Sequence, residues 1–342
     1  MKRPRNVTYA AQMKRRRRAL RALFVIASLV VVAVAAALLT RTWQPSAAIS
    51  SETRERSSPK IEIVAPRLVL DKITRAETIT LAAYSLPATS LIVRDLESAA
   101  DRGAHVSVAL SRGFGFYVAE NRATANELRA HGMRVHILES TTDSTHIKAV
   151  VLDGDLFLSD RNWTTTSREE IVIHDTVPGD RILVERAILG VPGGNDHLWT
   201  RKADALAEEA AVLEHQHSHF VRVSSESFGA GTPVFDELIV RARAGDQVEL
   251  IVATSEYRRS RSEPAELANL VASGVRVRTS NSNEKFAVDG EAVWIGSANA
   301  TKGAPDQIDF GLAITDLSIA RELASRFDSE WARAAPLSGQ AK

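Results

Sequence analysis

The chain has 342 residues, of which 44% are hydrophobic and 25% charged, and it can therefore bury one large core or two joined ones. It contains no cysteine, which excludes a disulfide scaffold, a thiolate zinc site and a thiol nucleophile. The net charge is +1, but residues 1–21 carry nine Lys or Arg and no acidic residue, so the rest of the chain carries about −8. A body of that sign repels a polyanion, and we do not expect nucleic acid as the natural partner.

The first 60 residues predict a membrane anchor followed by a linker. Residues 22–40 form a nearly uninterrupted apolar run without charge, which is long enough to cross the hydrocarbon core as a single helix. The positive charges of residues 1–21 predict that this segment stays in the cytoplasm and that the folded part lies outside the cell membrane. A cleavable signal peptide, which would release a secreted protein, is the alternative. Residues 41–60, rich in serine and in charges of both signs, predict a linker.

From residue 61 the hydrophobic pattern alternates between strands and helices. A strand is predicted over residues 77–84, followed by an amphipathic helix over 90–102 that ends at Gly103. The next predicted elements are a strand over 105–110, a helix over 117–131, a strand over 133–138 and a strand over 171–173. Strands separated by helices of this length predict an α/β fold with a mostly parallel or mixed sheet covered by helices.

The second half of the chain repeats this order. Its predicted elements are strands over 220–223, 247–253, 275–278 and 310–314, and helices over 234–244, 264–272 and 317–331. The glycines at 103 and 132 recur at 245 and 274, each 142 residues later. Self-similarity at a fixed offset indicates a duplicated unit. The sequence therefore predicts two repeats over 61–200 and 219–335, a connecting helix within 201–218, and a tail over 336–342.

A polar set on an apolar hairpin marks the first candidate site. Side chains alternate along a strand, so His146 and Lys148 project to the same side. The Asp153–Gly154 pair between two apolar runs predicts a hairpin turn, which would bring Asn162 back beside them. A base or nucleophile, a cation and an amide donor then converge. Such a set suits the chemistry of a phosphate group.

The second repeat carries the same plan with one substitution. Lys285, the Asp289–Gly290 turn, Ser297 and Asn299 follow in the same order, and the lysine and asparagine are 14 residues apart in both copies. Asn283 occupies the place that His146 has in the first copy. Glu284 follows it, and on a regular strand its side chain would point to the opposite face. The two turn aspartates are expected to be structural.

Both stretches resemble the HxKxxxxD(x)6GSxN signature of the phospholipase D superfamily, and the resemblance covers about residues 61–335. It implies two α/β repeats that pair across a pseudo-two-fold axis to form one active site, without a metal or an organic cofactor. The chain departs from the signature at Ser159–Asp160, which replaces Gly-Ser, and at Asn283, which replaces the second His. In both copies the distance from lysine to asparagine is one residue shorter than in the signature.

The resemblance also implies a role for each matched residue. His146 would be the nucleophile that becomes a phosphohistidine, with Lys148 and Lys285 as its catalytic cations. The phosphate would be held by Asn162, Ser297 and Asn299. An acidic residue that follows each motif would orient a histidine, and the candidates are Glu169, Glu170 and Asp309. Because Asn283 stands in the second motif, Asp309 is expected to lack the histidine that it would orient.

These observations predict a phosphodiesterase of the phospholipase D type, a hydrolase or transferase that acts on phospholipid or another phosphodiester at the membrane surface. The first alternative, which follows from Asn283, is a catalytically silent module that binds phosphate or lipid. The second is a nuclease acting on single strands. His215, His217 and His219 alternate as metal ligands on a strand would, but we interpret them as part of a solvated junction between a helix and a strand. The sequence carries no signal for an oligomeric state.

Overall fold

The computed structural model describes residues 60–337, apart from residues 114, 139–144, 164–169 and 216–217. The predicted basic segment, membrane span and nearly all of the linker lie outside these residues, as do Glu169, His217 and most of the tail. None of the helices in the described part of the chain has the length and apolar character needed to cross a bilayer. The predicted anchor over residues 22–40 therefore remains a prediction.

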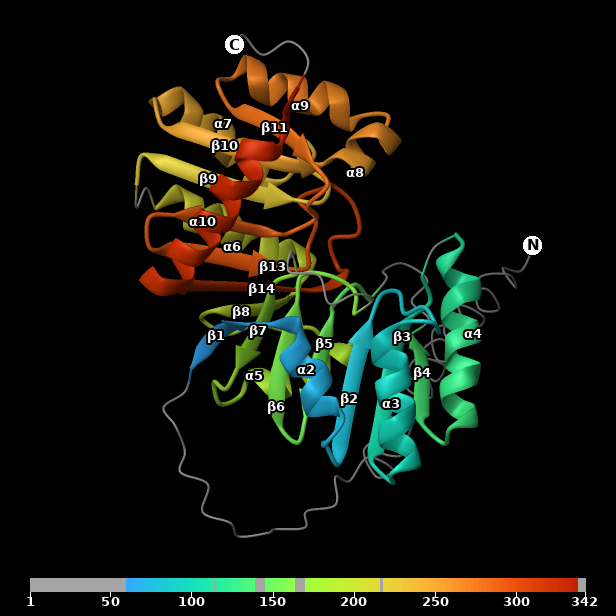
Figure 1. The fold of residues 1–342 in the computed structure, drawn as a ribbon. Coiled ribbons are helices and arrows are strands. Elements are labelled where there is room, and N and C mark those ends of the chain that lie inside the picture. Colours follow the sequence, from blue (N-terminus) through green and yellow to red (C-terminus); the bar gives the residue numbers. More distant parts are fainter. Residues whose placement is uncertain (1–59, 114, 139–144, 164–169, 216–217, 338–342) are drawn as a thin grey trace, which may run out of the picture. The chain divides into compact units, whose positions relative to one another are not determined.

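The first repeat forms a sheet of seven strands in the order β1-β7-β6-β5-β2-β3-β4 (Figure 1). The strands are β1 (Ile61–Val64), β2 (Thr78–Ala83), β3 (His105–Ser111), β4 (Arg134–Leu138), β5 (Ala149–Leu152), β6 (Asp155–Ser159) and β7 (Val172–Asp175). Only β2, β3 and β4 pair in parallel, while the remaining neighbours are antiparallel. The sheet is therefore mixed and not mostly parallel, because the short turn between β5 and β6 can join only antiparallel strands.

The second repeat has the same topology. Its strands are β8 (Leu198–Arg201), β9 (Phe220–Ser225), β10 (Gln247–Ala253), β11 (Arg276–Ser280), β12 (Phe286–Asp289), β13 (Ala292–Gly296), β14 (Ile308–Thr315) and β15 (Ala335–Pro336). They lie in the order β15-β11-β10-β9-β12-β13-β14-β8. Without β15, this order matches the first sheet strand for strand, with β8 in the place of β1. The predicted duplication is thus present in the fold.

Helices pack on both faces of each sheet. Those of the first repeat are α2 (Pro66–Ile73), α3 (Leu91–Asp101), α4 (Tyr117–Ala130) and α5 (Asp180–Ile188). Those of the second are α6 (Lys202–Glu214), α7 (Pro233–Ala244), α8 (Thr254–Arg259), α9 (Glu263–Ala272) and α10 (Leu317–Arg333). The helix predicted to connect the repeats is α6, and it packs on the second sheet through Ala205, Leu206 and Leu213. With β8 it occupies the place that α2 and β1 have in the first repeat.

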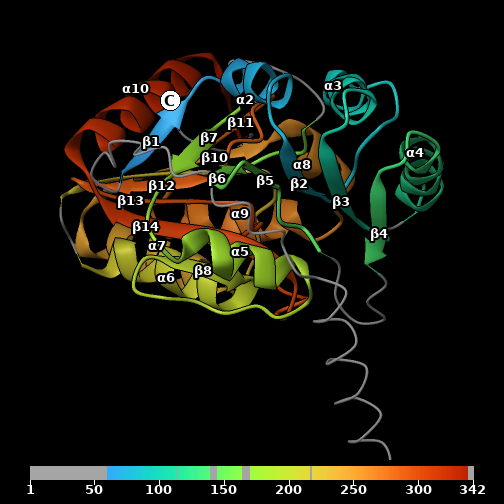
Figure 2. The same cartoon turned by 90° about the horizontal axis from the view of Figure 1, so that it is seen from below.

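The two sheets share one hydrophobic core. Strand alternation sends Ile79 and Leu81 of β2 to a cluster with α2 and α3, while Ala82 joins a cluster that contains residues of both repeats. This shared cluster includes Ile147 from the first repeat and Phe310 from the second. Helix α10 belongs to it, whereas α6 and α7 pack on the other face of the second sheet (Figure 2). The shared core holds the two repeats together next to their motifs.

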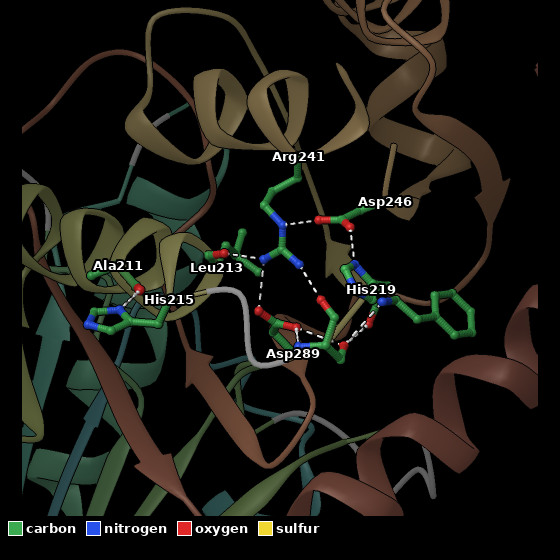
Figure 3. A network of polar contacts seen from close by, with 9 residues as sticks. Ala211, Leu213, His215, His219, Arg241, Asp246 and Asp289 are labelled. Carbon is green, nitrogen blue, oxygen red and sulfur yellow. Dashed lines mark hydrogen bonds and ion pairs between the residues drawn. The ribbon is translucent and has the colours of Figure 1, made fainter. Parts of the chain in front are cut away.

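The two turn aspartates stabilise their hairpins. Asp153 accepts hydrogen bonds from the backbone N–H groups of Glu77 and Thr78, at 3.0 and 2.8 Å. Asp289 is fully buried and pairs with Arg241, whose Nη1 lies 2.8 Å from Asp289 Oδ2 (Figure 3). The same guanidinium contacts Asp246, 2.5 Å away. Both turn residues are therefore structural, as the sequence predicts.

The histidines around the start of the second repeat have separate partners. His215 contacts the backbone oxygen of Ala211 on α6, and the exposed His219 pairs with Asp246 at 2.7 Å (Figure 3). Within the described residues, no group of three or more His, Asp or Glu side chains is arranged to hold a metal ion. His215 follows α6 and His219 precedes β9, so both lie at a junction between a helix and a strand.

Candidate active site

A cavity of about 490 Å³ collects the polar residues of both motifs. Six predicted site residues line it, three from each repeat: His146, Lys148, Asn162, Asn283, Lys285 and Asn299. The two lysines therefore share one cavity, as the pairing of two motifs around a single anion requires. Ser297, Asp309 and Glu170 lie behind this lining and are buried.

The segment before β5 directs the first motif into the cavity. The backbone N–H groups of His146 and Ile147 both donate to the oxygen of Ile308, at 2.6 and 2.8 Å, and this contact joins the two repeats. Ile147 is buried in the shared core, while His146 and Lys148 line the cavity. The alternation predicted from the sequence is thus confirmed, and the apolar residue between them anchors both polar side chains.

His146 is oriented by an acid from the other repeat. Its Nδ1 lies 2.7 Å from Oδ1 of Asp309, which is fully buried and also accepts a hydrogen bond of 2.8 Å from the hydroxyl of Ser297. Burial lowers the pKa of His146, and the charge of Lys148 lowers it further. Burial by itself would raise the pKa of Asp309, but the imidazole and Lys148 hold it below its ordinary value. The pair is therefore a neutral imidazole that donates from Nδ1 to a carboxylate, which leaves Nε2 with its lone pair.

This geometry corrects two expectations. Asp309 does not lack a histidine, because the acid that follows one motif reaches across to the histidine of the other repeat. Ser297 does not line the cavity, because its hydroxyl donates to Asp309 and its oxygen accepts from the N–H of Phe310 at 3.0 Å. It therefore supports the orienting acid instead of contacting a phosphate directly.

Glu170 is the counterpart of Asp309 in the first repeat. Its Oε1 accepts a hydrogen bond of 3.0 Å from the hydroxyl of Ser159. The neighbouring backbone contacts also match: the N–H of Ile171 donates to Asp160 at 3.0 Å, and the N–H of Phe310 donates to Ser297 in the second repeat. The other carboxyl oxygen of Glu170 is buried and has no hydrogen-bond partner among the described residues. Burial, reinforced by the charge of Asp160, raises the pKa of Glu170 to about 8. Glu170, and not Asp309, is the acid whose histidine is replaced by Asn283.

The two lysines have matching local contacts. Lys148 Nζ donates to the backbone oxygen of His146 at 2.6 Å, and Lys285 Nζ donates to that of Asn283 at 3.2 Å. Burial lowers the pKa of Lys148 to about 7, and the charge of Lys285 acts in the same direction. Two buried ammonium groups that repel each other favour an anion between them, because its charge offsets the repulsion.

The asparagines complete the lining from both sides. Asn162 accepts a hydrogen bond from the N–H of Ser85 at 3.2 Å, which fixes the orientation of its amide. Asn299 Oδ1 is buried and accepts no hydrogen bond from the described residues. Each amide supplies N–H donors of the kind that bind phosphate oxygens. Glu284 points away from the cavity and pairs with Arg326 at 3.0 Å, as the strand alternation predicts.

A family model described as "Cardiolipin synthase, PLD-like domain" matches residues 69–174 and 214–331, which are most of the folded part and include both motifs. The chain belongs to the phospholipase D superfamily. Each matched segment lies within one repeat of the fold. A comparison with curated proteins found no relative.

Two solved structures share the fold of this phospholipase D-like chain. Polyphosphate kinase from Porphyromonas gingivalis has a TM-score of 0.57 and 16% identity, and the match covers 84% of this chain and 54% of the kinase. The chain thus spans about half the length of that enzyme. Phosphatidylserine synthase from Haemophilus influenzae Rd KW20 has a TM-score of 0.57 and 12% identity, with 81% and 87% of the two chains covered. At these identities the likeness is one of fold alone.

The lining of the phospholipase D site also includes residues outside the two motifs. The cavity is also lined by Tyr84, Tyr117, Asp160, Arg161, Lys202, Glu226, Glu256, Arg259, Thr301 and Gln307. Together with the motif lysines, this gives five Lys or Arg against three Asp or Glu among the described lining residues. The excess of positive charge favours an anionic ligand although the body as a whole is acidic. A signal existed for one of them, since Glu226 directly follows the first central strand of its repeat.

Proposed function

We propose that this chain is a phosphodiesterase of the phospholipase D type that uses His146 as its nucleophile and requires neither a metal nor an organic cofactor. The observation that carries the proposal is the pair of His146 and Asp309 at one wall of a cavity that also contains Lys148 and Lys285. A neutral imidazole with a fixed tautomer is a competent nucleophile. Two cations from opposite repeats would hold the non-bridging oxygens of the phosphate beside it.

The reaction would proceed in two steps. In the first, Nε2 of His146 attacks phosphorus, the bond to the leaving oxygen breaks, and a phosphohistidine forms. Asp309 stabilises the positive charge that develops on the imidazole. Lys148, Lys285, Asn162 and Asn299 stabilise the charge on the phosphoryl oxygens. In the second step water or an alcohol attacks phosphorus, and His146 leaves as the neutral base.

A phospholipid is the substrate class that we favour. The support is the predicted membrane span over residues 22–40, which would place the folded part at the outer surface of the membrane. An acidic body with a cationic cavity fits a single phosphodiester headgroup better than a long polyanion, because only the cavity is attractive. A single-strand nuclease is the alternative that uses the same chemistry.

One observation favours a second candidate, a silent module that binds phosphate or lipid. Asn283 cannot donate a proton at ordinary pH, and losing a general acid reduces the rate of such a reaction by about 10²–10⁴. The cavity would still hold a phosphate through the two lysines, because these contacts do not depend on a proton donor. The two candidates therefore differ in turnover and agree in binding.

The test uses the full chain in detergent micelles with phosphatidylcholine, bis-p-nitrophenyl phosphate and a single-stranded oligonucleotide. We expect turnover of at least one diester, and a phosphoryl adduct on the peptide that contains His146 after a quench in base. His146→Ala abolishes both, whereas His136→Ala, which alters an exposed histidine of β4, changes neither. Binding of phosphatidylcholine micelles without turnover of any substrate would select the silent module.

A further inference from the structure

Proton donation to the leaving group has no assigned residue, because Asn283 replaces the second histidine. The duplicated topology identifies which residue lies nearest to that place. Strands β2 and β9 are equivalent, and the first residues after them are Tyr84 and Glu226, 142 positions apart. Both side chains line the cavity. A residue at this position therefore faces the same site from either repeat.

In the first repeat this position lies next to the histidine. The ring of Tyr84 packs edge-on against the imidazole of His146, with 5.0 Å between the centroids. In the second repeat the equivalent carboxylate, Glu226, lies 2.9 Å from Nζ of Lys285, the residue two positions after Asn283. The same Nζ donates to the backbone oxygen of Asn283. Glu226 is thus beside the motif position that has lost its imidazole.

We propose that Glu226 takes over the function of the missing second histidine and donates the proton to the leaving oxygen, an inference that rests on the proposed function. His146 and Glu226 come from opposite repeats and line the same cavity, which both motif lysines also line. An in-line displacement needs the nucleophile and the proton donor on opposite sides of phosphorus. Three acidic residues belong to the described lining, and among them the carboxylate of Glu226 forms an ion pair with a motif lysine. Glu256 pairs instead with Arg259, and the carboxylate of Asp160 accepts hydrogen bonds from the backbone N–H groups of Ile171 and Lys285.

The step balances with this assignment. The lone pair of His146 Nε2 forms the bond to phosphorus, and the electrons of the breaking bond go to the leaving oxygen. That oxygen takes the proton of the Glu226 carboxyl group and departs as an alcohol. The resulting carboxylate then removes a proton from the incoming water or alcohol when the phosphohistidine is cleaved. Glu226 thereby returns to its protonated form, and no additional reactant is needed.

Substrate binding supplies the protonated carboxyl group. Burial favours the neutral form of Glu226, but Lys285 outweighs it and, with His146 and Lys148, lowers the pKa to about 2 in the free protein. Tyr117 of α4 lines the same cavity, and burial together with the charge of Glu226 raises the pKa of its phenol. A phosphodiester carries negative charge to Lys285 and competes for that ion pair. The pKa of Glu226 then rises towards that of a buried carboxyl group, and a proton enters from solvent.

A purely structural role would make Glu226 a positioning residue that only holds Lys285. The two roles respond differently to the leaving group. A nitrophenolate departs without help, whereas an alkoxide must be protonated as its bond breaks. A lost proton donor therefore slows the alkyl diester much more than the aryl diester. A displaced Lys285 slows both equally, because it contacts the phosphoryl group that both share.

The experiment measures single-turnover cleavage of bis-p-nitrophenyl phosphate and of phosphatidylcholine by an excess of the full chain in micelles. We expect Glu226→Gln, which keeps the shape of the side chain, to lower the rate for the alkyl diester at least about 100-fold more than that for the aryl diester. The wild-type rate for the alkyl diester falls as pH rises, and the variant loses this slope. Glu256→Gln, the matched control in the same cavity, changes the two rates by the same factor.

Equal losses on both substrates, or no loss on either, would overturn the role of Glu226. These results leave the proposed function intact, because the wild-type aryl cleavage and its loss in His146→Ala are measured in the same series. A wild-type protein that cleaves none of the diesters refutes the proposed function, and the inference fails with it. The Tm of each variant is measured as a control for folding. A Tm within about a few degrees of the wild-type value establishes that the fold is kept.

Discussion

The contact between His146 and Asp309 gives the sharpest prediction for the proposed mechanism. Asp309→Asn removes the charge but keeps the size of the side chain. The hydrogen bond is 2.7 Å long and Asp309 is fully buried, so solvent does not screen the interaction. A hydrogen bond to a charged group contributes about 1.5–3 kcal/mol, which corresponds to about 10–100-fold in rate. Loss of the correct tautomer adds to this, and the same change in a serine protease triad costs about 10⁴-fold. We expect kcat to fall about 10²–10⁴-fold.

The pH dependence of kcat/KM provides an independent test of the same variant, Asp309→Asn. His146 attacks as the neutral imidazole, so activity is lost as pH falls through its pKa. The charge of Asp309 raises that pKa, although burial and Lys148 prevail in lowering it. Removing the charge lowers the pKa further, and the acid limb of the profile of kcat/KM should move to lower pH. An acid limb that moves upward would contradict the assignment of the neutral tautomer.

Glu170→Gln is the matched control, because Glu170 holds the equivalent place in the other repeat. Its pKa of about 8 means that it is protonated at neutral pH, so an amide reproduces its charge. We expect less than about a threefold change in kcat, since no histidine adjoins it in the described structure. Steady-state hydrolysis of the aryl diester gives kcat for the wild type, Asp309→Asn and Glu170→Gln. If Asp309→Asn were as active as Glu170→Gln while both remained folded, the orienting role of Asp309 would be refuted.

Two further predictions concern the second motif and the fold. In the Glu226→Gln variant, Asn283→His should place an imidazole beside the carboxyl group of Glu170 and raise the rate for an alkyl diester about 10–100-fold, because it supplies a proton donor of the family type. The rate of phosphatidylcholine cleavage measures this, and an unchanged rate with an intact fold would show that the assumed symmetry of the two motifs is wrong. Arg241→Ala should lower the free energy of unfolding by about 3–5 kcal/mol, because it leaves the carboxylate of Asp289 buried without its cation. Urea denaturation followed by circular dichroism measures the loss, and Arg222→Ala, which breaks a partly exposed pair, should cost less than about 1 kcal/mol.

The sequence predicted the longer helices and the central strands. The helix predicted over 90–102 is α3 (Leu91–Asp101), and the strand predicted over 247–253 is β10. Several short elements were not predicted. Strand β1 has only four residues, all of intermediate burial, and β8 has four residues that alternate between buried and half-buried. A four-residue strand gives two residues for each face, and this is too few for a period of two to emerge from the background.

The site could be predicted as far as each motif determines its own geometry. The positions of His146 and Lys148 follow from strand alternation, which acts between neighbours in the chain. The partner of His146 does not, because Asp309 is 163 residues away and reaches it only through the packing of two repeats. Reading each repeat as self-contained therefore assigned Asp309 to the empty position at Asn283. The shared hydrophobic core sets the register that joins the acid of one repeat to the histidine of the other.

That exchange of partners explains why one motif can lose its histidine while the chain retains a complete nucleophile. His146 needs Lys148 from its own segment and Asp309 with Ser297 from the second repeat, and none of these depends on position 283. The loss at Asn283 isolates Glu170 alone, which is buried and neutral at ordinary pH and so leaves no unpaired charge in the core. Each repeat thus supplies one member of two pairs, His146 with Asp309 and position 283 with Glu170. Only the pair that contains His146 still has its histidine.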